Sequence, residues 1–229
     1  MVKNMAEKLN LLTSSILIFL TGISFFTVCF IFILTLLLPQ KCAGAEITIL
    51  FLGDSLTAGL GVEQDEAYPA LLEKMLGEKG YEDLTLVNAG ISGSTTASAI
   101  SRLKWYSRVK PDILFLALGA NDGLRGLSLE AMEKNLEKAI VAALESGMKV
   151  ILAGMEIPPN YGPEYTSNFR NVFKLLSEKH NIFFMPFLLK DVAGEQKYNQ
   201  ADGIHPNAEG HKIIASNVFP YINEMVKNK

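Results

Sequence analysis

From Ile47 onward the sequence alternates between short apolar runs and longer stretches with helical spacing, and this alternation constrains the fold more than any other feature. The apolar runs are four to seven residues long and almost continuous, which is typical of strands buried on both faces of a sheet. They lie at 47–52 (ITILFL), 84–87 (LTLV), 112–118 (DILFLAL), 149–153 (KVILA) and 182–185 (IFFM).

Between these runs, apolar residues recur every three or four positions, as on one face of an amphipathic helix. The clearest example is 129–144, which has Leu, Met and Ile on one face and Glu and Lys on the other. Similar stretches cover 66–79, about 95–108 and 206–227. Strands separated by helices imply a parallel sheet that is covered on both faces. The sequence therefore predicts an α/β fold, a three-layer α/β/α sandwich of flavodoxin-like type with about five parallel strands.

The N-terminal segment has a different character, because Leu11 to Leu38 is a run of 28 residues without a charged side chain. This is more than the ~20 residues that a helix needs to cross a bilayer. Its length favours a retained membrane anchor, whereas Ala43-Gly44-Ala45 resembles the cleavage site of a signal peptide. We expect residues 1–45 to be an apolar helix of one of these kinds. In either case residues 46–229 are expected to be exported, to the periplasm or another extracytoplasmic space.

The expected exported part has 184 residues, a usual size for one domain. It carries 18 basic and 23 acidic residues, so its formal charge of −5 gives no basic footprint for nucleic acid. Cys29 and Cys42 both lie in the N-terminal segment, which leaves the domain without a disulfide or a cysteine-based metal site. With three histidines in the whole chain, a histidine-rich metal cluster is not expected either. We predict that the protein uses no metal and no cofactor.

In open parallel sheets, ligands bind at the carboxyl ends of the strands, so the loops that follow the apolar runs are the candidate site. Small and polar residues collect in all of them. In chain order they contain Gly53-Asp54-Ser55, NAGISGST (88–95), LGANDG (118–123), GMEIPPNYGPEY (154–165) and ADGIHPNAEG (201–210).

Taken singly, these residues leave alternatives open. Ser55 suits a helix N-cap, a phosphate ligand or a nucleophile. Asp202 and His205 suit either a capping pair before a helix or a histidine oriented by an acid. Gly93 and Asn121 could donate hydrogen bonds to a ligand or only shape their turns. Together, a hydroxyl, two such donors and an acid–histidine pair are the groups that acyl transfer requires.

Four sequence blocks, GDSLTAG, GISGST, GAND and DGIHP, occur in this order and together resemble the SGNH (GDSL) hydrolase family. The resemblance covers essentially all of 46–229, and NYGPEY and NDGLRG look most like its exported thioesterase, lysophospholipase and arylesterase branch. It implies that Ser55 is the nucleophile, His205 the general base and Asp202 the residue that orients it. It also implies an oxyanion hole made by the Ser55 and Gly93 backbone N–H groups and the Asn121 side chain.

The implied reaction is the hydrolysis of a carboxylic ester or thioester through an acyl-enzyme, without a metal or cofactor. We expect the loop 156–165 to contact the acyl group, with Pro158 and Tyr161 as substrate-binding residues. Three other functions stay open. The first is an O-deacetylase of cell-envelope polysaccharide, the second a flavin- or phosphate-binding module that uses 53–59, and the third a membrane-anchored binding protein without catalysis.

Four further residues are interpreted as structural. Asp122 is expected to hold the loop in which it lies. Trp105 shares a helical stretch with apolar residues, which favours packing in the core. His180, at an expected helix end, and His211, inside the last helix, are expected to be surface or capping histidines.

Overall fold

The computed structural model describes residues 46–81 and 83–227. The predictions for residues 1–45 therefore lie outside the described residues. No helix within the described ranges is both long enough and apolar enough to span a membrane. Ala45–Lys229 forms a compact unit by itself, and the sheet and the hydrophobic core described below lie within it.

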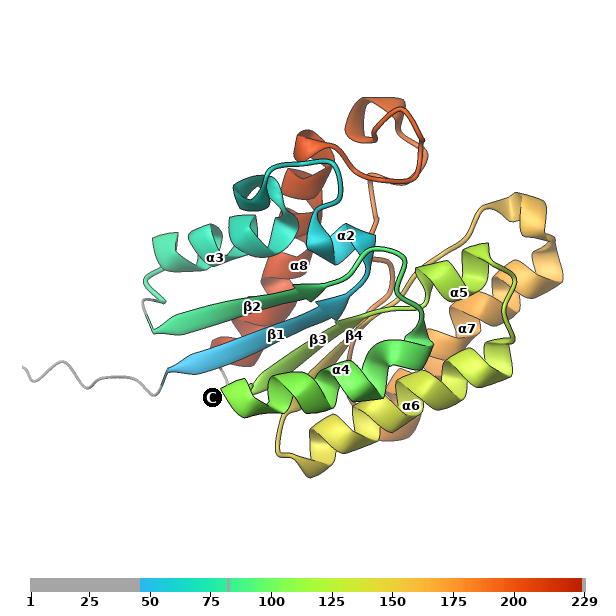
Figure 1. Cartoon of the computed structure of the whole chain (residues 1–229). Helices are drawn as coiled ribbons and strands as arrows, with labels where there is room; N and C mark the ends of the chain where they lie inside the picture. Colours follow the sequence, from blue (N-terminus) through green and yellow to red (C-terminus); the bar gives the residue numbers. More distant parts are fainter. Residues whose placement is uncertain (1–45, 82, 228–229) are drawn as a thin grey trace, which may run out of the picture. The chain divides into compact units, whose positions relative to one another are not determined.

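The centre of the domain is a sheet of five parallel strands in the order β2-β1-β3-β4-β5 (Figure 1), as the alternation in the sequence predicts. The chain begins the sheet at β1, adds β2 on one side of it and then β3, β4 and β5 on the other. The carboxyl ends of β1, β2 and β3 therefore meet where the direction of winding reverses, which is where such sheets bind ligands. The strands are β1 (Ile47–Gly53), β2 (Leu84–Gly90), β3 (Ile113–Ala117), β4 (Lys149–Ala153) and β5 (Phe183–Met185).

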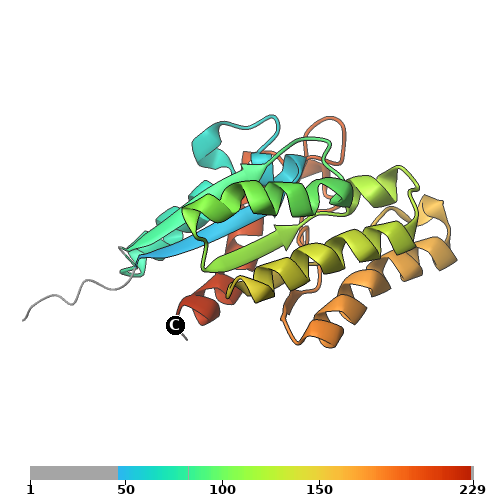
Figure 2. The same cartoon turned by 60° about the horizontal axis from the view of Figure 1, so that its bottom comes forward.

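Helices cover both faces of the sheet (Figures 1 and 2), which completes the predicted three-layer sandwich. On one face α3 packs against α8, and on the other α6 packs against both α4 and α7. Two of the helices, α2 and α5, are short and begin directly after strands. The helices are α2 (Ser55–Ala58), α3 (Tyr68–Glu78), α4 (Ala99–Tyr106), α5 (Ala120–Leu124), α6 (Leu129–Glu145), α7 (Pro163–His180) and α8 (Ala208–Lys227).

The core forms where both faces of the central strands are covered. All five residues of β3 are buried, and so are Ile49 to Leu52 of β1. Phe51 and Phe115, on neighbouring strands, pack with ring centroids 5.0 Å apart. Such burial is why these strands are almost purely apolar and do not alternate. The core fixes the carboxyl ends of β1 and β3, and the candidate site lies at these ends.

The alternative that His211 is a surface histidine is wrong, and the alternative that it is a capping histidine is confirmed, although the helix that it caps is α3 and not its own. Its side chain is buried, and its Nδ1 accepts a hydrogen bond of 3.2 Å from the backbone N–H of Tyr68. Tyr68 is the first residue of α3, so its N–H has no acceptor within its own helix. Helical spacing could not predict this contact, because the N–H that His211 accepts belongs to a residue 143 positions away.

The buried His211 makes the stability of the domain depend on pH. Burial lowers the pKa of His211 to about 4, below the 6.5 of an ordinary histidine. Neutral His211 therefore favours the folded state above pH 6.5, and this contribution is lost as the pH falls towards 4. The His211→Asn variant keeps an acceptor near Nδ1 but does not titrate. Between pH 6.5 and 4 we expect the unfolding free energy of the unmodified protein to fall by ~3 kcal/mol more than that of the variant, measured by urea unfolding. Equal pH profiles would contradict the prediction.

The prediction that Trp105 packs in the core is also wrong, because 60 % of its surface is exposed. The buried side of α4 is formed by Ala99, Arg102 and Leu103 instead. Arg102 occupies the place expected for an apolar residue, and its guanidinium donates to the carbonyl oxygens of Gly53 and Ala89. The helix is therefore rotated relative to its apolar pattern, and Trp105 lies on the outer face.

Candidate active site

The nucleophile candidate lies at the junction of β1 and α2. Here Asp54, and not Ser55, is the helix cap: its Oδ1 accepts the Leu56 N–H at 3.1 Å. Ser55 is the first residue of α2, and its Oγ lies 3.0 Å from Nε2 of His205. The hydroxyl of Ser55 is thus directed to the histidine, and the capping interpretation of Ser55 no longer holds.

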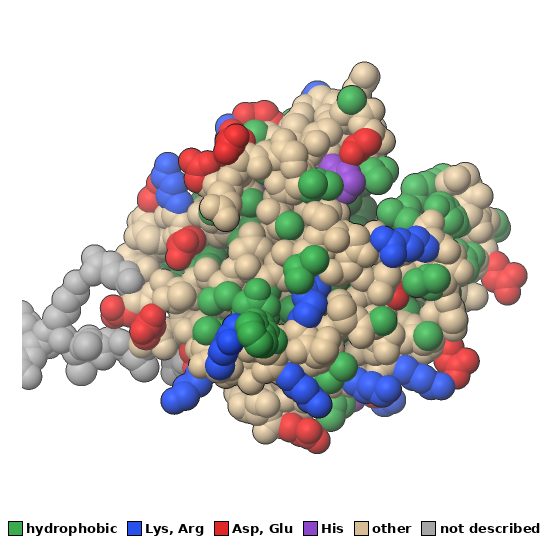
Figure 3. Space-filling model, in the orientation of Figure 1, with side chains coloured by type: hydrophobic (Ala, Val, Ile, Leu, Met, Phe, Trp, Pro, Cys, Tyr) green, Lys and Arg blue, Asp and Glu red, His purple; other side chains and the backbone are tan. Residues whose placement is uncertain are grey.

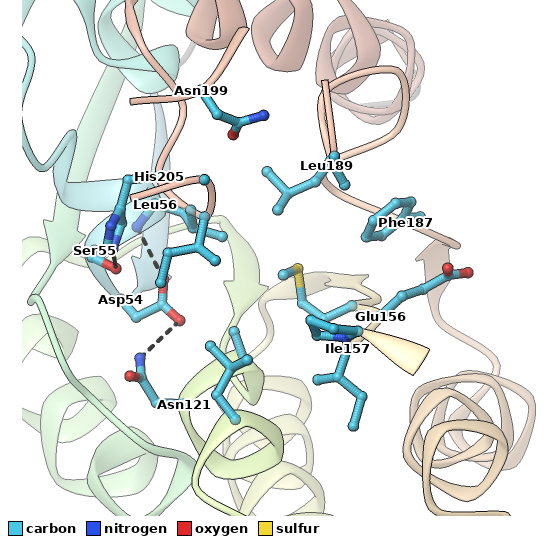
Figure 4. A pocket seen from close by; sticks show the side chains of 18 of the residues that line it. Asp54, Ser55, Leu56, Asn121, Glu156, Ile157, Phe187, Leu189, Asn199 and His205 are labelled. Atoms are coloured by element: carbon cyan, nitrogen blue, oxygen red, sulfur yellow. Dashed lines mark hydrogen bonds between the residues drawn. The ribbon is translucent and has the colours of Figure 1, made fainter. Parts of the chain in front are cut away.

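Ser55, His205 and Asp202 form one hydrogen-bonded chain, although 150 residues separate the first two (Figure 4 shows the Ser55–His205 bond). His205 Nδ1 lies 2.6 Å from Asp202 Oδ2. Asp202 Oδ1 accepts the backbone N–H groups of Ile204 and His205, each at 3.0 Å. The hydrogen bond from the His205 side chain, with these two backbone bonds, lowers the pKa of Asp202 to about 2. Asp202 is therefore an ionised acceptor that fixes the imidazole ring with Nε2 towards Ser55.

The two other predicted donors lie after the neighbouring strands β2 and β3. Asn121 is in α5, directly after β3, and its Nδ2 lies 3.3 Å from Oδ2 of Asp54. Gly93 lies in the loop after β2 with a φ of 75°, a left-handed conformation that favours glycine. The structure thus brings all five predicted site residues, Ser55, Gly93, Asn121, Asp202 and His205, to the carboxyl-terminal edge of one sheet.

Arg125 connects the two donor residues, and sequence reasoning missed it. Its Nη2 donates to the carbonyl oxygen of Gly93 at 3.0 Å and to Oδ1 of Asn121 at 3.4 Å. Because Oδ1 is bound by Arg125 and one hydrogen of Nδ2 by Asp54, the orientation of the Asn121 amide is fixed. The second hydrogen of Nδ2 is then available to a ligand. The only sequence signal was the NDGLRG block, in which an arginine lies four residues after Asn121, one helical turn away.

Asp54 is the second site residue that the sequence did not single out. It is buried, and burial raises its pKa to about 6, against 3.8 for an ordinary aspartate. The raised pKa means that the protonated form favours folding below pH 3.8, and that this contribution is lost as the pH rises through 6. An ionised Asp54 at neutral pH thus costs stability, which is typical of a residue kept for its function.

Asp122 is a structural residue, as predicted, but it lies in α5 and binds the segment after β2 instead of holding a loop of its own. Its two carboxylate oxygens accept the backbone N–H of Thr96 at 2.9 Å and the hydroxyl of Thr96 at 2.6 Å. Thr96 follows Gly93 by three residues, so this contact joins the segment after Gly93 to the helix that carries Asn121.

A cavity of about 500 Å³ opens beside Ser55 and His205. In Figure 4 these two side chains lie at one end, and Ile157 and Phe187 lie across from them. Pro158 lines it, as predicted. Tyr161 does not: its hydroxyl donates to the carbonyl oxygen of Leu124 at 2.7 Å and ties the loop to α5. Most of the lining is apolar, from Leu56, Ala120, Leu124, Met155, Ile157, Pro158, Pro159, Phe187, Leu189, Ala193 and Ile204.

This geometry argues against the phosphate- or flavin-binding alternative. An anion would bind at the N-terminus of α2, but the Asp54 carboxylate already occupies that position. The helix has four residues, too few for a strong dipole, and the cavity is mainly apolar.

Comparison with known proteins agrees with these features. Residues 51–213 match the model of the GDSL-like lipase/acylhydrolase family. The chain belongs to this family. Among curated relatives, esterase TesA of Pseudomonas aeruginosa is 38% identical over 194 residues, covering 84% of this chain and 96% of the relative. An arylesterase of Vibrio mimicus is 37% identical over 185 residues (80% and 90%). Thioesterase 1/protease 1/lysophospholipase L1 of Escherichia coli K12 is 31% identical over 198 residues (86% and 93%).

Solved structures of family members have the same fold. The crystal structure of TesA superposes with a TM-score of 0.75 at 38% identity, and covers 78% of this chain and 99% of that one. The psychrotrophic esterase EstA from Pseudoalteromonas, solved in a form inhibited by monoethylphosphonate, gives 0.74 at 35% identity (79% and 98%). The fold is thus shared with these two solved proteins.

Proposed function

We propose that this protein is a serine hydrolase that cleaves carboxylic ester or thioester bonds of acyl substrates through an acyl-enzyme. The observation that carries the proposal is the hydrogen-bonded chain from Ser55 through His205 to Asp202 at the mouth of an apolar cavity. The family membership and the esterase, arylesterase and thioesterase names of the relatives support it.

The first half of the reaction forms the acyl-enzyme. His205 Nε2 takes the proton of Ser55 Oγ as this oxygen attacks the carbonyl carbon of the substrate. The Asp202 carboxylate stabilises the imidazolium that results and holds its ring in place. The negative carbonyl oxygen of the tetrahedral intermediate accepts hydrogen bonds from Asn121 Nδ2 and from the backbone N–H groups of Ser55 and Gly93. His205 then gives its proton to the leaving alcohol or thiol.

Water completes the cycle. It enters beside His205 after the leaving group has departed, loses a proton to Nε2 and attacks the acyl carbon. The same donors bind the second oxyanion, and Ser55 is regenerated with release of the acid. Each proton that moves in this scheme passes through one nitrogen of His205, which explains why the other nitrogen is fixed by a carboxylate at 2.6 Å.

The cavity supports an acyl group longer than acetyl. Its volume of about 500 Å³ is within the usual range for pockets of small-molecule ligands, and its walls are mainly aliphatic. Each methylene that leaves water for such a wall stabilises the bound state by ~0.8 kcal/mol, about a fourfold effect. We therefore expect kcat/KM to rise about fourfold per added methylene until the acyl group fills the cavity.

The proposal is tested by measuring hydrolysis of p-nitrophenyl esters from acetyl to palmitoyl and of an acyl-thioester, with a phosphonate ester as a covalent inhibitor. A rise in rate with chain length and inhibition by the phosphonate are expected. A rate that is highest for acetyl and falls with every added carbon would favour the deacetylase alternative. A folded protein that hydrolyses none of these substrates would overturn the proposed function.

Leu189 offers a direct test of which side chains bind the acyl group. It lines the cavity and is 9 % exposed. In Leu189→Trp the larger ring occupies space now open to substrate. We expect kcat/KM to fall ~10-fold or more for palmitoyl and to stay within about threefold for acetyl esters. Leu175→Trp, on the exposed face of α7, is the matched control. Parallel losses for both esters would mean that Leu189 does not bound the acyl site.

We also propose that residues 46–229 act outside the cytoplasm. The uncharged run from Leu11 to Leu38 and the Ala43-Gly44-Ala45 sequence support export, by a retained anchor or a cleaved leader. N-terminal sequencing of the mature protein distinguishes the two: a new N-terminus at Glu46 means cleavage, and an intact one means an anchor.

A further inference from the structure

Trp105 is exposed in a way that neither the fold nor the active site explains. It is the only tryptophan of the chain, and 60 % of its surface is accessible. The guanidinium carbon of Arg108 lies 3.5 Å from the centre of its ring, so a cation covers one face of the indole. Val109, beside them in sequence, is 41 % exposed. An exposed tryptophan of this kind is typical of a surface where an apolar phase meets a polar one.

Three exposed cations lie within five residues of Trp105 in the sequence, and one of them, Arg108, covers its ring. Lys104, Arg108 and Lys110 are all exposed, and none of them lies within salt-bridge distance of a carboxylate in the part of the chain that the structure describes. Glu145 lines the same shallow hollow as Lys104, between α4 and α6. In Figure 3 hydrophobic and basic side chains lie side by side over the region where Figure 1 places α4. We call Lys104, Trp105, Arg108, Val109 and Lys110 the Trp105 patch.

The Trp105 patch lies at the opposite edge of the sheet from the active site. It ends just before β3 begins, and the backbone N–H of Asp112 donates to the carbonyl oxygen of Thr48 at the start of β1. The patch is therefore next to the point where the chain enters the domain (Figure 1). The 45 residues before that point contain the uncharged run of 28 residues. The cavity, by contrast, opens at the carboxyl ends of the strands.

We propose that the Trp105 patch binds the surface of a membrane that contains anionic lipids. Tryptophan is enriched at the level of lipid headgroups, where its ring is apolar and its N–H is hydrated. Each lysine or arginine near an anionic bilayer contributes about 1 kcal/mol, a factor of about five in affinity. Unpaired cations next to an exposed indole match the surface of an anionic membrane. A neutral apolar partner would leave these cations without a counter-charge. With the patch on the membrane, the cavity at the other edge of the sheet receives its substrates from the aqueous side.

The experiment uses residues 46–229 with Ser55→Ala, so that neither the N-terminal segment nor hydrolysis of lipid affects the result. This part holds the whole sheet and its core in one unit, which is why it is expected to fold alone. Vesicles of phosphatidylglycerol with phosphatidylcholine are compared with phosphatidylcholine alone. Because Trp105 is the only tryptophan, its fluorescence reports the patch directly. We expect a blue shift and co-sedimentation with the anionic vesicles only, both weakened by salt.

Variants identify the surface responsible. Arg108→Glu with Lys110→Glu is expected to lower the affinity for anionic vesicles at least ~25-fold, and Trp105→Ala ~10-fold. The control pair Lys174→Glu with Lys190→Glu makes the same change in charge on other exposed residues and is expected to have an effect under about threefold. With Ser55 present, the patch variants should hydrolyse a water-soluble ester at the unmodified rate, which shows that they are folded. No blue shift, or equal losses in the patch and control pairs, would overturn the proposal.

Discussion

Replacing Ser55 by alanine is expected to lower kcat/KM for p-nitrophenyl esters by ~10⁴–10⁶-fold, the largest effect of any single substitution in this chain. In the proposed mechanism the hydroxyl oxygen is the atom that bonds to the acyl carbon, and His205 Nε2 lies 3.0 Å from it, in position to take its proton. Without it, His205 and Asp202 have no nucleophile of the protein to activate. The residual rate would come from water activated by His205 and from the remaining oxyanion donors.

The same substitution is expected to change stability little. Ser55 loses one hydrogen bond to a partly exposed histidine, worth about 1 kcal/mol, and Asp54 still caps α2. Thermal unfolding therefore separates loss of chemistry from loss of structure. Labelling with a phosphonate ester, followed by mass spectrometry of the peptides, should place the adduct on Ser55 in the unmodified protein and on no residue in the variant.

Ser98→Ala is the matched control for Ser55→Ala. Ser98 is also a serine at a loop near the carboxyl-terminal edge of the sheet, but its hydroxyl donates to the carbonyl oxygen of Thr95 and not to a histidine. Its activity should remain within about threefold of the unmodified protein. Substantial esterase activity in Ser55→Ala would mean that another residue attacks the substrate.

The fold was predictable because its signal is local and repeated. Five apolar runs, each too short for a buried helix and separated by helical spacing, leave few arrangements other than a covered parallel sheet. The strand bounds differ from the prediction by up to three residues, as β2 continues through polar Asn88 to Gly90. Asn88 pairs with Phe51 of β1, and its side chain donates to the carbonyl oxygen of Thr57 in α2, a contact that no local pattern indicates.

The residues of the candidate site were predictable for a different reason. Ser55, Gly93, Asn121, Asp202 and His205 lie in loops that must meet if the strands are parallel, so the fold itself brings them together. The roles of Asp54 and Arg125 were not predictable in this way. Each acts through another side chain, and the geometry that joins them exists only after β1, β2 and β3 are paired. The far wall of the cavity was missed because 187–189 carries no motif.

The burial of Trp105 and that of His211 were predicted wrongly for a common physical reason. Both residues lie on helices, and the apolar pattern of each helix predicted which of its faces is buried. In both cases a backbone group in another element needs a hydrogen-bond partner, and this need decides which side chain is buried. Arg102 lies on the buried face of α4 because the carbonyl groups at the ends of β1 and β2 accept its hydrogen bonds. His211 lies on the buried face of α8 because the first N–H of α3 needs an acceptor. Periodicity describes apolar contacts and carries no information about such distant partners.

Asn121→Ala is expected to lower kcat by ~10²–10³-fold and to leave KM within about threefold. The Asn121 amide is fixed before substrate arrives, because Arg125 binds its Oδ1 and Asp54 binds one hydrogen of its Nδ2. The remaining hydrogen meets negative charge that develops on the carbonyl oxygen only as Ser55 attacks. A donor used in this way stabilises the transition state more than the bound substrate, so its loss lowers kcat and not binding.

Steady-state kinetics on one medium-chain p-nitrophenyl ester measures both constants, with Asn135→Ala as the matched control. Asn135 also presents an amide near this loop, but its Nδ2 lies 3.3 Å from Oγ1 of Thr96, away from the cavity. The control variant should keep kcat within about threefold. A rise in KM with unchanged kcat for Asn121→Ala would show that the amide binds ground-state substrate. The oxyanion would then depend on the backbone donors of Ser55 and Gly93, and Arg125 and Asp54 would orient a binding group instead of a catalytic one.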